Sequence, residues 1–179
     1  MSAQPRSEFR AEVGTVLHVG CGGSNVPEWI TARKEVRLDI DPRNEPDIVA
    51  DMRDLGMIGP FDCLYCCHAL EHLSRDDGLK ALGEFKRVLS PGGLAVVLVP
   101  DLEDIRPTGE VIYQCSVGPV TGLDMYYGLQ DLVVAREHMQ HKYGYVADTL
   151  RETMKRAGFD AVIVERQPGW NLLALGIAP

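Results

Sequence analysis

A glycine-rich turn and two aspartates could bind a nucleoside. The turn is Gly20-Cys21-Gly22-Gly23, where small residues let backbone N–H groups approach a ligand closely. Asp39 lies nineteen residues after Gly20, and a carboxylate at that spacing can accept hydrogen bonds from both hydroxyl groups of a ribose. Asp51 could accept a hydrogen bond from an adenine amino group. The turn alone is a weak signal, but the three features in this order indicate an adenosine-containing ligand without specifying which one.

A second motif, His68-Ala69-Leu70-Glu71-His72, matches H-x-x-E-H, the zinc motif of inverted metalloproteases. On a helix, His68 and His72 could share one metal ion, with Glu71 as a base. However, the segment follows an apolar run, and no further acidic ligand stands out downstream. The sequence favours a partly buried His72 that supports a loop over the ligand, and we expect no metal site.

Alternating apolar runs and helical patterns must position these residues. The apolar runs predict strands at residues 16–19, 36–40, 47–51, 63–67 and 94–99. Ser74, with Asp77 three residues later, resembles the start of a helix, and apolar spacing predicts another helix over 146–158. The alternation predicts an α/β fold with a Rossmann-like, doubly wound sheet, mostly parallel, with helices on both faces.

The end of the chain departs from this alternation. Residues 161–164 and 172–177 form two apolar runs, and Pro168-Gly169 separates them. Two strands joined only by a turn must be antiparallel. In the parallel part of such a sheet, ligands bind beyond the carboxyl ends of the strands. The glycine turn follows one predicted strand, and Asp39 and Asp51 lie at the ends of the next two, so they should meet at one edge.

Length, charge and cysteine content restrict the class of protein. The 179 residues suit one domain, with residues 1–13 as a leader, 14–179 as the domain, and 101–145 as a glycine-broken insert that forms a lid or substrate wall. A net charge of −8 disfavours nucleic acid and anionic membranes as partners. Five cysteines, no signal-peptide pattern and no apolar run longer than 94–99 predict a cytoplasmic protein that does not span a membrane.

Four stretches together resemble one protein family. Residues 17–23, 38–42, 61–73 and 84–93 look like the first motif, the second motif, the fourth-strand segment and the turn before the fifth strand of class I S-adenosylmethionine-dependent methyltransferases. The closest likeness is to small members of the type 11 kind. The resemblance implies the methyltransferase-type fold with a C-terminal antiparallel hairpin. It also implies S-adenosylmethionine as methyl donor and S-adenosylhomocysteine as product. The acidic charge and the short chain favour a small-molecule acceptor over a nucleic acid and leave a protein acceptor open.

The resemblance also implies roles for individual residues. Cofactor contacts fall to the backbone of the glycine turn, to a carboxylate on the ribose, to side chains around the adenine and to two residues at the sulfonium end. In that order, these are Gly20, Cys21 and Gly22; Asp39; Ile40, Asp51 and Met52; Cys67 and His68. His141 and His72 are the candidate catalytic bases on the acceptor side, since methyl transfer sometimes requires removal of a proton.

Two departures from the family pattern keep alternatives open. His18 stands where the family usually carries Asp or Glu, and Ser24 stands where its third glycine falls. A second hypothesis is therefore a methyltransferase-like fold that binds a nucleotide or a partner without catalysis. A third is a nicotinamide-dependent oxidoreductase, which the turn and Asp39 also permit, although the final hairpin counts against it. Apolar residues within 129–139 fit either a lid or a homodimer contact.

Overall fold

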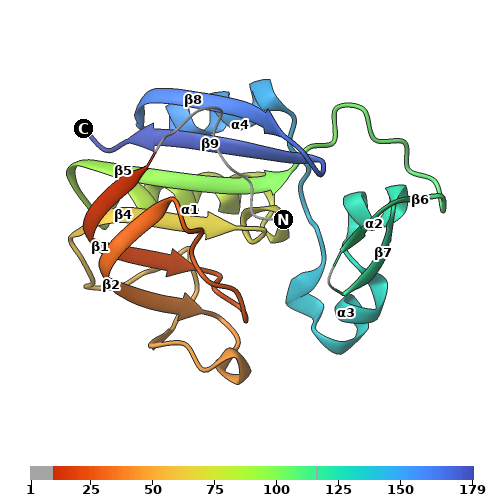
Figure 1. Ribbon diagram of the computed structural model, residues 1–179, viewed down its shortest axis with the longest axis horizontal. Coiled ribbons are helices and arrows are strands. Elements are labelled where there is room, and N and C mark those ends of the chain that lie inside the picture. The colour runs from red at the N-terminus through yellow and green to blue at the C-terminus, as the bar shows by residue number, and fades with distance from the viewer. Residues whose placement is uncertain (1–9, 116) are drawn as a thin grey trace.

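The computed structural model describes residues 10–115 and 117–179, which form a seven-stranded sheet and an attached insert (Figure 1). The strands of the sheet are β1 (Ala11–Val19), β2 (Ile30–Asp39), β3 (Ile48–Val49), β4 (Phe61–Cys67), β5 (Leu89–Pro100), β8 (Asp160–Gln167) and β9 (Asn171–Ile177). Their order is β3-β2-β1-β4-β5-β9-β8. The first five strands are parallel, and β9 pairs antiparallel with both β5 and β8. The predicted α/β fold with a mostly parallel sheet and a C-terminal hairpin is therefore confirmed.

The central strands are apolar because neighbours cover them on both faces. Val16, Leu17 and Val19 of β1 are fully buried, as are Val96 and Val97 of β5. Continuous apolar runs of this kind are typical of parallel strands inside an α/β sheet. These buried strands hold the loops at their carboxyl ends in place.

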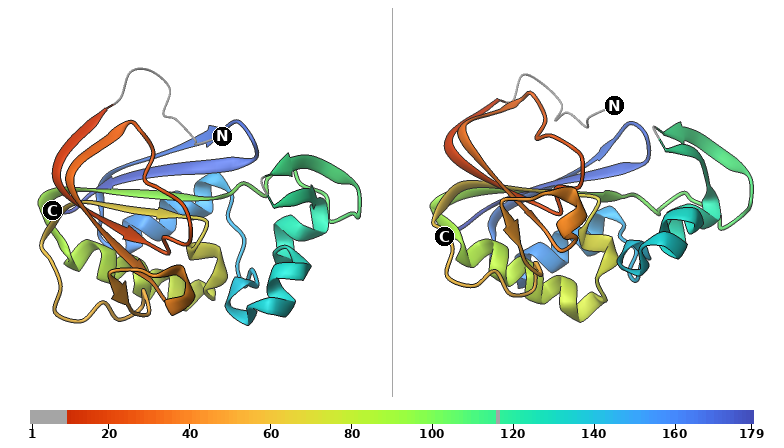
Figure 2. Two further views of the ribbon diagram at one scale, coloured as in Figure 1. Left: turned by 60° about the horizontal axis from the view of Figure 1, so that its bottom comes forward. Right: turned by 90° about the horizontal axis from the view of Figure 1, so that it is seen from below.

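Two helices pack on one face of the sheet. The α1 helix (Arg75–Arg87) begins as predicted at Ser74, whose Oγ accepts from the backbone N–H of Asp77. The α4 helix (Ala147–Arg156) is followed by Gly158, which has a φ of +92°. Apolar residues of both helices belong to one core cluster with β1, β4 and β5, and Figure 2 shows both helices on the same side of the sheet.

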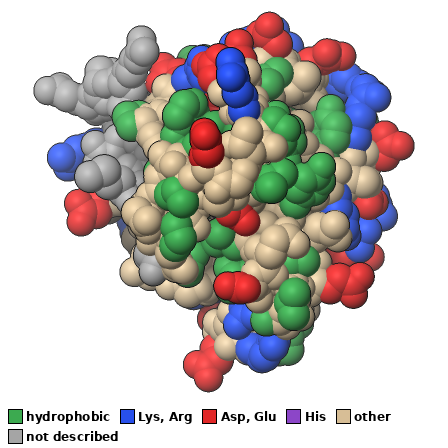
Figure 3. All heavy atoms as spheres, turned by 90° about the vertical axis from the view of Figure 1, so that its right-hand side faces the viewer, with side chains coloured by type: hydrophobic (Ala, Val, Ile, Leu, Met, Phe, Trp, Pro, Cys, Tyr) green, Lys and Arg blue, Asp and Glu red, His purple; other side chains and the backbone are tan. Residues whose placement is uncertain are grey.

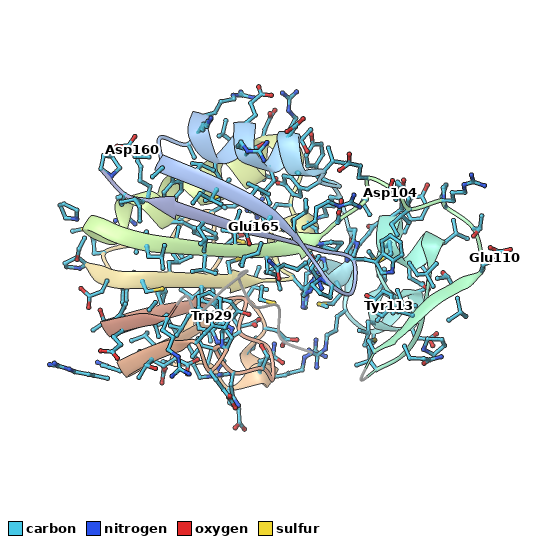
Figure 4. All side chains as sticks on the ribbon, turned by 45° about the horizontal axis from the view of Figure 1, so that its top comes forward. Trp29, Asp104, Glu110, Tyr113, Asp160 and Glu165 are labelled. Atoms are coloured by element: carbon cyan, nitrogen blue, oxygen red, sulfur yellow. The ribbon has the colours of Figure 1, made fainter. Side chains whose placement is uncertain are left out.

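The opposite face differs from the prediction that helices cover both faces. In the described ranges no helix connects β1 to β2, and residues 20–29 form turns and loop. Trp29 closes this face instead by packing in a second core cluster with Cys63 and Tyr65 of β4 (Figure 4). The connection is too short and too rich in glycine and proline to form a full crossover helix.

The strand boundaries also differ from the prediction. β1 begins at Ala11, which pairs with Ile30 at the start of β2, so residues 11–13 belong to the sheet and not to a leader. Residues 1–9 of the predicted leader lie outside the described residues. β2 starts six residues earlier than the expected 36–40, because its first half has exposed polar side chains at positions 31, 33 and 34 that hide it from an apolar-run criterion.

The insert lies beyond the carboxyl end of β5 (Figure 1). It contains β6 (Val111–Cys115), β7 (Gly118–Thr121), α2 (Gly122–Tyr127) and α3 (Gln130–Ala135). Ile105, Val120 and Met125 form its own small core. Helical structure within 129–139 is divided, since Arg136 is extended, and a 3-10 helix (Glu137–Met139) follows it.

The outer face of the insert carries scattered apolar side chains among charged ones (Figure 3). Val134 of α3 is 89% exposed, so it is available for a contact between two copies of the chain, and the homodimer stays a prediction. Among the described residues, no helix has the length and apolar character needed to cross a membrane.

Candidate functional site

The strand order reverses at β1, which lies between β2 and β4 in the sheet. A cavity of about 580 Å³ lies at the carboxyl ends of these strands. Ligands of open α/β sheets bind at this switch point, outside the carboxyl ends of the strands. All nine residues predicted to contact the cofactor line this one cavity. They are Gly20, Cys21, Gly22, Asp39, Ile40, Asp51, Met52, Cys67 and His68.

The glycine turn is held open by Asp39. One carboxylate oxygen, Oδ2, accepts from the backbone N–H of Gly22 at 2.8 Å, and Oδ1 accepts from that of Asp41 at 2.9 Å. A carboxylate offers about four lone-pair positions, so Asp39 keeps acceptor capacity for a ligand. Gly20 has a φ of +63°, and a Cβ there would lie 2.5 Å from the Cβ of Ala69. Packing against Ala69 thus requires glycine at position 20.

A polar network on β2 fixes the other side of the turn. Arg37 donates from Nη2 to the carbonyl of Gly22 and from Nη1 to that of Ser24, each at 2.8 Å. Its Nη1 also lies 3.4 Å from Glu35 Oε1, and the same oxygen is 2.9 Å from Nδ1 of the fully buried His18. Burial lowers the pKa of His18 despite the Glu35 carboxylate beside it. Arg37 was not among the predicted site residues, because in an alternating strand it resembles any exposed cation.

The adenine side of the cavity combines an exposed apolar side chain with a paired carboxylate. Ile40 is 49% exposed even though it is hydrophobic, as expected of a side chain that covers a ligand. Asp51 receives two bonds from Arg53 Nε, at 2.9 and 3.1 Å, and a third from Nη2 at 2.5 Å. These hydrogen bonds from Arg53 lower the pKa of Asp51. Met52 packs partly against the main core.

The end of β4 carries Cys67 and His68. Burial raises the pKa of the Cys67 thiol to about 11, so it is protonated at neutral pH and does not act as a nucleophile. Cys67 packs on the face that holds Cys63, whereas Cys66 belongs to the opposite core, as the alternation of a strand predicted. His68 has a φ of +49°, a conformation that costs energy in a non-glycine residue and is common at functional sites.

Polar contacts tie the insert to the carboxyl end of β2. Arg136 Nη1 donates to Asn44 Oδ1 at 3.2 Å and lies 3.4 Å from Asp41 Oδ2. His138 Nε2 is 3.9 Å from the same Asp41 oxygen. A side-chain hydrogen bond from Arg43 is the main cause that lowers the pKa of Asp41 to about 2. Arg136 lines the cavity, and no sequence signal pointed to it, because its partners lie on a distant element.

A second cavity of about 270 Å³ adjoins the first, and His68 and His72 line both. The insert supplies much of its wall, including Tyr113 of β6 (Figure 4) and His141. The two predicted catalytic residues, His72 and His141, therefore meet, with ring centroids 5.0 Å apart. His141 does not line the first cavity.

Both rings are oriented by backbone carbonyls. His72 Nδ1 lies 3.2 Å from the carbonyl oxygen of Gln140, and His141 Nδ1 lies 2.9 Å from that of Met125. Burial lowers the pKa of His72, which favours its neutral form at pH 7. Burial raises the pKa of Glu71, but the contact with His68 and the neighbouring imidazoles of His72 and His141 outweigh it and lower the value to about 2.

The protease-like arrangement of the H-x-x-E-H motif does not form. His68 follows β4 in a left-handed conformation, whereas Glu71 and His72 belong to a separate 3-10 helix (Leu70–His72). The two histidines of the motif therefore do not share a helical face. A different group forms instead, because the insert brings His141 to Glu71 and His72.

Comparison with known proteins gives a consistent result. Residues 3–164 match a family model described as a methyltransferase domain. An S-adenosylmethionine-dependent methyltransferase from Mesorhizobium loti is similar to the chain, with 16% identity over 96% of this chain and 93% of that one and a TM-score of 0.64. Another from Clostridium acetobutylicum has 12% identity over 92% of this chain and 84% of that one, with a TM-score of 0.62. The N-methyltransferase NodS of Bradyrhizobium japonicum, in complex with S-adenosylhomocysteine, has 15% identity over 94% of this chain and 79% of that one, with a TM-score of 0.58. No curated protein sequence matches the chain.

Proposed function

The chain belongs to the methyltransferase domain family, and from that premise we propose that it transfers a methyl group from S-adenosylmethionine to a small-molecule acceptor. One observation carries the choice of donor. Nine residues from four separate segments, selected for their likeness to a cofactor site, line a single cavity at the switch point of the sheet. The family assignment argues against the nicotinamide-dependent alternative.

The cavity suits S-adenosylmethionine in size and chemistry. Its volume of about 580 Å³ falls within the roughly 300–1,000 Å³ usual for small-molecule sites. Asp39 would hold the ribose, Ile40 would cover the adenine, and Asp51 would accept from the adenine amino group. The backbone of Gly20 and Gly22 would meet the methionine part. These assignments are part of the proposal.

The bound cofactor supplies an activated methyl group on a sulfonium, so the protein needs no fixed catalytic triad. The chain must hold the acceptor in line with that group and exclude water. The second cavity adjoins the sulfonium end, which His68 would mark. The Nε2 atoms of His72 and His141 are available there, either to accept a proton from the acceptor or to act as ligands.

The acceptor cavity favours a small molecule. Its volume of about 270 Å³ and its partly aromatic wall suit a compact ligand, and the net charge of −8 disfavours a nucleic acid. Burial raises the pKa of the Cys63 thiol to about 12 and that of Cys67 to about 11. Protected, reduced thiols suit a reducing compartment, so we include a cytoplasmic location in the proposal.

Calorimetric titration with S-adenosylhomocysteine tests the cofactor site. We expect micromolar binding, with NADH as a non-binding comparison. Asp39→Ala should weaken binding by about 100-fold or more, because two hydrogen bonds to a charged acceptor contribute at least about 3 kcal/mol.

Asp160→Ala is the matched control. Asp160 lies on β8 at the end of the sheet away from the insert (Figure 4), so its removal should leave affinity within about twofold, as surface substitutions usually do. A folded protein that does not bind S-adenosylhomocysteine would contradict the proposal. It would favour a methyltransferase-like fold without catalysis.

A further inference from the structure

Three side chains with metal-binding chemistry converge beside the second cavity. Glu71 and His72 come from the 3-10 helix after β4, and His141 comes from the insert. One ligand atom from each lies within 4.8 Å of the others. The backbone carbonyl of Glu71 accepts from the N–H groups of Lys142 and Tyr143, at 2.9 and 3.2 Å. These bonds hold the segment that carries His141 next to Glu71.

The hydrogen bonds of the two imidazoles suit metal ligation. A carbonyl oxygen can only accept, so Nδ1 of His72 and Nδ1 of His141 must each carry the proton that they donate to Gln140 and Met125. In the neutral ring this leaves the lone pair on Nε2. Histidines that bind metals through one nitrogen almost always donate the other N–H to a carbonyl or carboxylate, which fixes their tautomer and orientation.

Glu71 provides an independent indication. The residue is 2% exposed, and neither carboxylate oxygen has a hydrogen-bond partner within the described part of the chain. Nδ1 of His68 lies 3.3 Å from Oε1. A buried carboxylate without hydrogen bonds is costly, and such groups in proteins are usually paired or coordinate metals.

We propose that Glu71, His72 and His141 bind a divalent transition-metal ion of the Zn²⁺ type. Two imidazoles and one carboxylate form the ligand set of catalytic zinc sites, which keep coordination positions open. Ligand atoms around a tetrahedral zinc ion lie about 3.3 Å apart, as its bonds of about 2.0–2.1 Å require. The three ligand atoms, which lie within 4.8 Å of one another, must therefore adopt this spacing when the ion binds.

All three ligands line the second cavity, so the open positions would face the acceptor, and this gives the ion a role that rests on the proposed function. An acceptor hydroxyl would bind the ion, which lowers its pKa and orients its oxygen. The oxygen then loses its proton to water and gains the methyl carbon, while the carbon–sulfur bond breaks with its electron pair on sulfur. The products are a methyl ether, S-adenosylhomocysteine and one proton. The favoured acceptors are hydroxyl compounds.

The expectation of no metal site concerned a different set of residues. His68 and His72 were paired on a presumed helix, and no further acidic ligand stood out downstream. The third ligand is His141, which reaches the site only through the path of the insert. Glu71 and His72 of the H-x-x-E-H motif thus combine with His141, which lies too far along the sequence for a motif to include it.

Metal titration of the full-length protein tests the site directly. After removal of metals with a chelator, we expect one Zn²⁺ to bind per chain by calorimetry, and one Co²⁺ to give the visible absorption of a protein-bound ion. His141→Ala and Glu71→Gln should each weaken Zn²⁺ binding by more than about tenfold, since even outer partners of ligands cause such losses. Glu71→Gln keeps the size of the buried side chain, so either variant can be informative if the other fails to fold.

His138→Ala is the matched control, since His138 lies three residues from His141 in the same insert but outside the group of three. It should bind Zn²⁺ within about twofold of the unchanged chain. Equal affinity of the His141→Ala and His138→Ala proteins, or no binding by the unchanged chain, would overturn the metal site. Asp39→Ala should lose S-adenosylhomocysteine but keep Zn²⁺, so failure of the cofactor proposal and failure of the metal proposal give different results.

The open positions have their own test. Azide, a small anion that binds vacant metal positions, should change the absorption of the Co²⁺-loaded protein. An unchanged spectrum at saturating azide would mean that the ion has no vacant position, and would overturn its role in holding the acceptor.

Discussion

Replacing Arg37 should loosen the cofactor turn without unfolding the sheet. Arg37 is the residue that holds the carbonyls of Gly22 and Ser24, each at 2.8 Å, while Asp39 holds the N–H of Gly22 from the other side. The peptide groups that would face the methionine part of the cofactor are thus fixed from both directions. Arg37→Met keeps much of the apolar stem and removes both donors.

The size of the effect follows from these two bonds. The Arg37 side chain is 25% exposed, so water competes with it, and each bond contributes about 1 kcal/mol, below the roughly 1.5–3 kcal/mol usual for bonds to charged groups. Together they stabilise the binding-competent turn by about 2 kcal/mol. In the variant, part of the ligand's binding free energy is spent on ordering the turn. Loss of the full 2 kcal/mol would weaken binding by about 30-fold, and loss of about 1.4 kcal/mol would weaken it by about tenfold.

Calorimetric titration with S-adenosylhomocysteine measures this, with thermal unfolding in parallel. Arg33→Met on the same strand is the control and should leave affinity within about twofold, because Arg33 is exposed. Arg37→Lys should be intermediate, since an ammonium keeps the charge but cannot reproduce the two fixed donors of a guanidinium. Unchanged affinity in a folded Arg37→Met protein would refute the argument that this network shapes the turn.

Two further outcomes concern stability. Gly20→Ala should destabilise the fold by roughly 2–4 kcal/mol in urea titration, because the residue has a φ of +63° and its new Cβ would lie 2.5 Å from Ala69. Gly23→Ala is the control and should keep the stability of the unchanged chain, because nothing lies within 4 Å of its new Cβ. Equal losses in the two variants would contradict the reasoning. Burial holds the pKa of His18 and His72 below the ordinary 6.5, so the unfolded chain binds protons that the folded chain resists, and the free energy of unfolding should fall as the pH drops below about 6.5. Urea titrations across that pH should show a smaller dependence in His18→Gln, and an identical dependence would argue against His18 as a source.

The parts of the fold that could be predicted from the sequence depend on local patterns. The apolar run of β5 is confirmed, as are the Ser74 cap of α1 and the turn at Pro168-Gly169 between β8 and β9. The β6–β7 hairpin was missed, since Gly118-Pro119 in β7 resembles a turn. The missing helix before β2 follows from a loop closed by Trp29, a long-range contact that periodicity does not contain.

The candidate cofactor site was predictable for a geometric reason. Parallel strands end at one edge of the sheet, so residues that follow β1, β2 and β4 must lie near one another wherever the loops run. Gly20, Asp39 and His68 therefore line one cavity. Arg136 could not be found in this way, because its contact with Asn44 joins segments 92 residues apart and depends on how the insert folds back.

The difference between residues at strand ends and residues of the insert explains why the family indicates the reaction but not the acceptor. The cavity proposed for the cofactor is built mainly from strand ends, whose positions follow from the shared sheet. The cavity proposed for the acceptor takes much of its wall from the insert, including Tyr113 and His141, and the insert has its own small core around Met125. Changes in the insert can therefore alter the acceptor, and any metal ligand it supplies, while the sheet and the cofactor turn stay the same. The chemistry particular to this chain should then be sought in residues 101–145.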